Sequence, residues 1–342
     1  MGVSARRLPL LALGLVCLVF GITGGLARLT PALAAPSAAI GWHGALMVSA
    51  FLGTVIALER AVALGGWWPF AAPLSAGLGG LLVLGGMHAA GLALLAGAGV
   101  VFALCSAVFL YRQPSVETAT LAAGALAWLA GNVALDAGGA PLPWWIAFLV
   151  LTIAGERLEL SRYLKRGAFP RIAFIALAAA LFVSPADASM RLQGVVLALL
   201  AAWLLAYDLA RFTVRQKGLP RFVAWCLLPG YGWLALGGAL LAAGGAAGAF
   251  RDTALHAVFL GFVFSMIFGH APVILPAVLR VRFPWHPVLY LPLALLHASL
   301  AVRAFVSTAL GAWGNAAAIA LFIVTAFALG ARRARAPRGR AA

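Results

Sequence analysis

Long apolar runs follow one another through nearly the whole chain, separated only by short polar or basic connections. A helix rises about 1.5 Å per residue, so each crossing of a hydrocarbon layer about 30 Å thick needs about 20 predominantly apolar residues. The pattern therefore predicts an all-α, polytopic membrane protein with about twelve transmembrane helices. The runs cover residues 8–28, 42–64, 72–90, 91–111, 117–136, 143–163, 169–185, 190–211, 221–247, 253–279, 286–309 and 314–331.

Few charged residues are available to cover a water-exposed surface. Charged side chains make up 9% of the 342 residues and hydrophobic ones 64%, whereas an ordinary soluble domain is about 25% charged. This composition excludes a water-soluble globule. We predict one transmembrane helical domain over residues 1–331, followed by a basic, disordered cytoplasmic tail over residues 332–342.

Basic residues outnumber acidic ones by 24 to 8, which gives a formal net charge of +16. They occur in short clusters between apolar runs, so they form no continuous surface for nucleic acid, and the bilayer is the expected partner. With twelve crossings, nearly all the clusters fall on one side, which the positive-inside rule makes cytoplasmic together with both termini. These clusters contain Arg6, Arg7, Arg112, Arg162, Lys165, Arg166, Arg171, Arg211, Arg215, Lys217, Arg221, Arg280 and Arg282.

The three cysteines do not indicate a function. Cys17, Cys105 and Cys226 lie in three different apolar runs, and the sequence has no CxxC or CxxCH motif. A disulfide scaffold, a zinc knuckle and covalently attached haem are therefore not expected.

Two histidines lie at matching depth near the outer membrane surface. His43 begins the second run and His256 lies near the start of the tenth, and both runs point from outside to inside. Neutral imidazoles on facing helices can supply the two axial nitrogens of a haem iron, so we predict a cofactor site at His43 and His256. Alternatively, both are ordinary interfacial histidines, like the neighbouring Trp42 and Arg251.

A second histidine pair is expected deeper, toward the cytoplasmic side. His270 in the tenth run and His297 in the eleventh are at similar depth on antiparallel helices, and imidazole suits copper and several other transition metals. Pro272 and Pro276 interrupt backbone hydrogen bonds beside His270. We predict a metal site at His270 and His297, with a purely structural kink as the alternative.

A Glu-Arg pair recurs near the cytoplasmic ends of two runs, as Glu59-Arg60 in the second and Glu156-Arg157 in the sixth. Because the second, sixth and tenth runs are four apart, the sequence suggests three repeated arcs of four helices. Alternatively, the pairs mark where helices leave the bilayer. Glu59 is the better candidate for a structural tie or proton relay, since its apolar run continues to Leu64.

Twelve runs with histidines at the outer start of the second and on the tenth resemble the haem-copper oxidase catalytic subunit. The segments WHGALM (42–47), FLGT (51–54) and HAVFLGF (256–262), with Gly269-His270, are more similar to the NnrS-type proteins. Those are bacterial membrane proteins associated with haem, copper and resistance to nitric oxide stress.

The resemblance implies a haem b with His43 and His256 as axial ligands, propionates near Arg28 and Arg251, and copper at His270 and His297. It implies a bacterial inner-membrane protein that handles nitric oxide, a related small redox ligand, or electrons. Oxidases place three histidines for copper on the sixth and seventh helices, but residues 143–186 contain none. A terminal oxidase is therefore not expected.

Two other classes of function stay open, as does the question of whether the chain is an enzyme. The first is a proton-coupled transporter or channel that uses the proline-interrupted tenth helix with Glu59, His270 and His297. The second is a membrane assembly protein, in which these residues would affect abundance alone.

Overall fold

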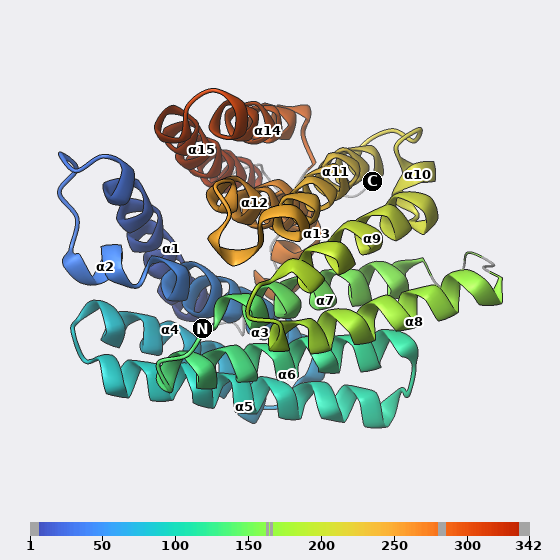
Figure 1. The fold of residues 1–342 in the computed structure, drawn as a ribbon, viewed down its shortest axis with the longest axis horizontal. Coiled ribbons are helices and arrows are strands. Elements are labelled where there is room, and N and C mark those ends of the chain that lie inside the picture. Colours follow the sequence, from blue (N-terminus) through green and yellow to red (C-terminus); the bar gives the residue numbers. More distant parts are fainter. Residues whose placement is uncertain (1–6, 162–163, 165–166, 280–284, 335–342) are drawn as a thin grey trace, which may run out of the picture.

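The computed structural model describes residues 7–161, 164, 167–279 and 285–334, and all regular structure in these ranges is helical (Figure 1). The all-α prediction is confirmed. Helix α15 continues to Ala334, and the rest of the predicted disordered tail, residues 335–342, lies outside the described ranges, as do Arg6, Arg162, Lys165, Arg166, Arg280 and Arg282.

The helices succeed one another with short connections. In order they are α1 (Leu8–Leu29), α2 (Ser37–Gly41), η1 (Ala45–Leu52), α3 (Gly53–Leu64), η2 (Trp68–Phe70), α4 (Ala71–Leu84), α5 (His88–Arg112), α6 (Val116–Asp136), α7 (Leu142–Leu160), α8 (Ala168–Val183), η3 (Ser184–Ala186), α9 (Arg191–Tyr207), α10 (Ala210–Thr213), α11 (Leu219–Gly244), η4 (Gly245–Ala247), α12 (Arg251–His256), η5 (Ala257–Phe264), α13 (Ser265–Leu279), η6 (Pro287–Leu289), α14 (Tyr290–Phe305) and α15 (Thr308–Ala334).

Nine helices in the described part of the chain are long and apolar enough to cross a membrane. The remaining three predicted runs also form helices. Two are shorter, at Trp68–Leu84 and Arg191–Tyr207, and the third is α7, which carries three charged residues near its end. The structure thus supports a multi-pass membrane protein.

The predicted boundary between the third and fourth runs, at residues 90 and 91, is displaced in the structure. Helix α4 ends at Leu84 and α5 begins at His88. Between them Gly86 adopts a φ of +81°, a left-handed conformation that glycine tolerates and that ends a helix. His88 therefore belongs to α5.

Three helical segments form the interior of the bundle. Among the span-length helices, Ala45–Leu64 and Arg251–Val278 are 67% and 61% buried, whereas the others are 17–44% buried. Helix α7 is also buried along most of its length, and α3, α7 and α13 lie near the centre of Figure 1. These are the second, sixth and tenth of the predicted runs.

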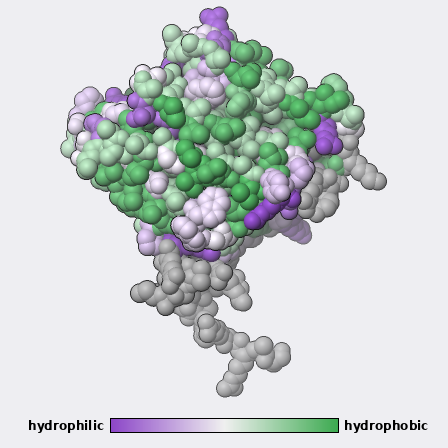
Figure 2. All heavy atoms as spheres, turned by 90° about the horizontal axis from the view of Figure 1, so that it is seen from below, coloured by the Kyte–Doolittle hydropathy of each residue, from purple (hydrophilic) through white to green (hydrophobic). Residues whose placement is uncertain are grey.

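Apolar side chains also cover much of the outer surface, as a bilayer environment requires. Val19, Leu104, Ile172 and Phe327 are among the large hydrophobic residues exposed there. Figure 2 shows broad hydrophobic areas on one face, with hydrophilic residues gathered toward its margins. Such surfaces are compatible with contact to lipid.

A π-helix follows each of His43 and His256. Segment η1 begins two residues after His43, and η5 begins directly after His256. The eighth residue after each histidine is a phenylalanine, and these two rings, Phe51 and Phe264, stack with centroids 6.1 Å apart. π-Helical segments are rare and often occur at functional sites. The structure therefore repeats one local unit on two inner helices.

Candidate functional site

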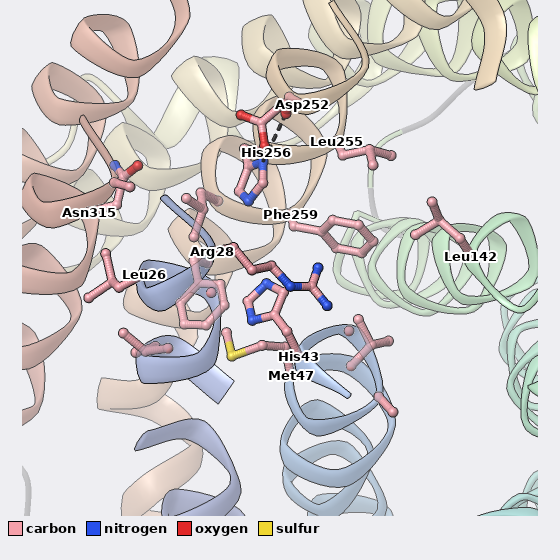
Figure 3. A pocket seen from close by; sticks show the side chains of 18 of the residues that line it. Leu26, Arg28, His43, Met47, Leu142, Asp252, Leu255, His256, Phe259 and Asn315 are labelled. Carbon is pink, nitrogen blue, oxygen red and sulfur yellow. Dashed lines mark hydrogen bonds and ion pairs between the residues drawn. The ribbon is translucent and has the colours of Figure 1, made fainter. Parts of the chain in front are cut away.

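A cavity of about 490 Å³ lies between helices from the first, middle and last parts of the chain, and both His43 and His256 line it (Figure 3). Figure 3 shows the two imidazoles directed into this common space from opposite sides. The volume falls within the range of about 300–1,000 Å³ that is typical of ligand pockets. The structure thus brings together the two histidines that the sequence pairs by depth.

His43 is held against helix α1 through one ring nitrogen. Its Nδ1 lies 2.6 Å from the carbonyl oxygen of Gly21. A carbonyl only accepts hydrogen bonds, so Nδ1 carries the proton and donates. In the neutral ring, Nε2 then has the free lone pair that a metal ligand requires.

His256 has the same arrangement with different partners. Its Nδ1 lies 2.8 Å from the carbonyl oxygen of Asp252 and 3.2 Å from that residue's Oδ1. Arg303 donates two hydrogen bonds, of 3.0 and 2.9 Å, to the same carboxylate. Metal-binding histidines commonly donate their second ring N–H to a carbonyl or carboxylate in this way, which fixes the orientation of the ring.

The polar lining of the cavity has an excess of positive charge. Arg28, Arg251 and Arg303 line it, and Asp252 is the only acidic residue among its described lining residues. The Arg28 guanidinium lies beside His43 in Figure 3 and donates to the carbonyl oxygens of Ile40 and Gly41. This balance favours a ligand that carries negative groups.

The remaining walls are mostly apolar. Phe259, Leu26, Leu142 and Trp145 contribute to them. Asn315 also lines the cavity, and its buried Oδ1 has no hydrogen-bond partner among the described residues. The cavity therefore suits a large apolar ligand with a charged edge.

His270 and His297 lie outside this cavity and have separate partners. His297 accepts a hydrogen bond from Trp233 Nε1 at Nδ1, at 3.1 Å, and its Nε2 lies 3.3 Å from Ser265 Oγ. His270 Nδ1 lies 3.0 Å from the carbonyl oxygen of Met266. Within the described ranges, the structure contains no group of three or more His, Cys, Asp or Glu side chains that would hold a metal ion.

The tenth run is irregular in a different place from the one that its prolines indicate. Helix α13 continues through Pro272 and Pro276 to Leu279. The departure from α-helical geometry lies earlier, in π-helix η5 beside His256. The irregular backbone of this run therefore belongs to the cavity beside His256 and not to His270.

Comparison with known proteins places this architecture in a family. A family model described as a domain of unknown function, DUF8744, matches residues 7–331. The chain belongs to the DUF8744 family. No curated protein and no solved structure matches the chain. The matched range contains every residue named above as lining the cavity, so the cavity lies within the DUF8744 domain.

Two residues that support His256, namely Asp252 and Arg303, have no role in the sequence interpretation. Asp252 positions His256, and Arg303 holds Asp252 in place. The signal for Asp252 is its position four residues before His256, which places the two side chains on one face of a helix. Arg303 is 51 residues from Asp252, and nothing in the spacing links them.

Proposed function

We propose that this protein is a haem-binding protein of the bacterial inner membrane, with twelve transmembrane helices and both termini in the cytoplasm. His43 and His256 would hold a haem b at the outer end of the inner helices, and the protein would handle nitric oxide, a related small redox ligand, or electrons. The observation that carries the proposal is the presence of two imidazoles in one cavity, each with Nδ1 engaged and Nε2 free.

The rest of the cavity suits the same group. Its apolar walls match a porphyrin face, while Arg28 and Arg251 are placed to pair with propionates. The sequence has no CxxCH motif for covalent attachment, which favours the b type. We do not extend the proposal to copper at His270 and His297, because both ring nitrogens of His297 have hydrogen-bond partners.

A haem, when bound, supplies one-electron redox chemistry and iron coordination of small ligands. The chain's own contribution is to fix the two imidazoles. Asp252 and Arg303 orient His256, and the Gly21 carbonyl orients His43. Both imidazoles would hold the iron of an electron-transfer haem, whereas a haem that also takes a gaseous ligand would be held by one of them. His256 is held by the partly exposed carboxylate of Asp252. Water therefore reaches the hydrogen-bond partner of His256 more easily than that of His43.

The absorption spectrum of the purified protein tests this proposal directly. We expect the α and β bands of a low-spin b-type haem on reduction, with iron and no copper in stoichiometric amount. A colourless protein would overturn the proposal. A colourless protein that also shows proton-coupled solute uptake, lost on His270→Ala, would instead establish the transporter alternative.

Gly25 gives a more local prediction, because the His43 ring packs directly against it. A Cβ at position 25 would lie 2.6 Å from His43 Cε1 and 2.9 Å from Nδ1. Gly25→Ala should therefore displace the imidazole. Loss of a hydrogen-bond partner that orients a metal ligand lowers metal affinity about 10–100-fold, and we expect Gly25→Ala to lower haem affinity at least as much. The measurement is haem per polypeptide after purification.

Gly41→Ala is the matched control for Gly25→Ala. Gly41 lines the same cavity, but a Cβ there meets nothing within 4 Å. It should keep the full haem content. Equal haem content in both variants would show that the position of His43 does not matter for haem binding.

A further inference from the structure

A buried ionic cluster lies around the inner helices, at the end of α3 and α7 away from the cavity. Arg157 on α7 forms two hydrogen bonds, of 2.9 and 3.0 Å, with Asp208, and these side chains are 5% and 1% exposed. Arg60 on α3 pairs with Glu156 at 2.7 Å. Each arginine in the cluster therefore already has one carboxylate partner.

A third carboxylate makes the charges of this cluster unequal. Glu59 precedes Arg60 on α3, is partly buried, and has Glu156 and Arg60 as its electrostatic neighbours. No ion pair or hydrogen bond joins its side chain to another described residue. Three carboxylates thus face two guanidinium groups. An unpaired carboxylate at membrane depth is costly, and binding one proton removes its charge.

Tyr231 extends the polar cluster beside the Arg157–Asp208 pair. Its side chain is fully buried, with Arg157 and Asp208 as electrostatic neighbours, and its hydroxyl has no hydrogen bond of good geometry in the described part of the chain. Buried hydroxyl groups are nearly always satisfied, commonly by water. The Tyr231 hydroxyl lies within reach of Arg157 and Asp208, so a small shift of these side chains or a bound water would complete its hydrogen bonding.

None of the other described charged or titratable groups around Glu59 forms an ion pair with it. Helix α13, which packs on α3, contributes His270, whose electrostatic neighbours are Glu156, Arg157 and Asp208. The packed elements η1, η2 and α4 contain no charged or imidazole side chain. The charged and imidazole residues of α1 and α5 lie at or beside the ends of these helices. They are Arg7, Arg28, His88 and Arg112, and α7 adds Glu159.

We infer that Glu59 is an exchangeable proton-binding site beside the Arg60–Glu156 pair, at one side of a cluster that continues through Arg157 to Asp208. The ligand is a proton from the adjacent aqueous phase. Protonation converts the Glu59 carboxylate to a carboxylic acid and changes the charge of the five acidic and basic side chains from −1 to zero. This inference does not depend on haem binding.

Infrared difference spectroscopy of the full-length protein in lipid nanodiscs tests the inference. A protonated carboxylic acid has a carbonyl stretch that a carboxylate lacks and that shifts in D₂O. We expect this band at pH 7, where an ordinary glutamate with a pKa of about 4.3 is ionised, and we expect it to disappear at high pH. Glu59→Gln should remove it.

The control is Glu117→Gln, at the first turn of α6, which should leave the band unchanged. If Glu59→Gln does not fold, Glu59→Asp keeps the acid and should move the band in frequency. The inference is overturned if the wild type lacks the band at pH 7, if the band survives Glu59→Gln, or if Glu59→Asp leaves its frequency unchanged. Haem content is measured on the same samples, so that the two proposals fail separately.

Discussion

Replacing His43 or His256 with alanine is expected to abolish haem binding. Each substitution removes one of the two nitrogens that the cavity presents with a free lone pair, and the Met47 thioether in the same cavity is a weaker donor than imidazole. Loss of an orienting partner alone typically lowers metal affinity 10–100-fold, so loss of the ligand itself should lower it by more than about 100-fold. Reduced-minus-oxidised spectra and haem extraction from purified protein measure the effect.

His286→Ala is the control for these two variants. His286 precedes the short helix η6, where its Nδ1 accepts a hydrogen bond from the Val288 backbone N–H at 3.1 Å. It lines no part of the cavity, and the haem spectrum should be retained. If His43→Ala and His256→Ala also retain an unchanged spectrum, the axial assignment is wrong even when the protein binds haem.

The helical architecture was predictable because one physical requirement dominates the sequence. Apolar runs of membrane length must form helices, since no other open structure satisfies backbone polar groups in hydrocarbon. Details that depend on single residues were less predictable. Gly86 ends α4 earlier than hydropathy indicates. The π-helices after His43 and His256 have no hydropathy signal, because the change affects the backbone register and leaves the composition apolar.

Only that part of the candidate site which follows from the depth of a residue along its helix was predictable from the sequence. Counting along two helices of the same direction pairs His43 with His256, and both line one cavity. The same counting pairs His270 with His297, but it cannot show that Trp233, 64 residues from His297, donates to that ring. Hydrogen bonds between distant helices depend on side-chain direction, which depth does not specify. The metal prediction at this second pair stays a prediction.

Breaking the Arg157–Asp208 pair should be the most destabilising single polar substitution in the chain. Asp208→Asn leaves the Arg157 guanidinium 5% exposed and without its compensating charge. Removing one partner of a buried ion pair costs about 3–5 kcal/mol, because the remaining charge stays desolvated. The free energy of unfolding in detergent micelles should fall by this amount. Asp136→Asn, at the exposed end of α6, should change it by less than about 0.5 kcal/mol.

A double variant separates the free-energy cost of an uncompensated buried charge from the stabilisation that the ion pair itself contributes. Arg157→Met with Asp208→Leu removes both charges while it keeps apolar volume, and such replacements are often neutral or stabilising. We therefore expect the double variant to be more stable than Asp208→Asn. Asp208 also accepts a hydrogen bond from the Ala210 backbone N–H at 2.7 Å, so part of the loss, about 1 kcal/mol for a helix cap, should remain. A double variant as unstable as Asp208→Asn would show that this cap and the local packing, and not the buried charge, account for the effect.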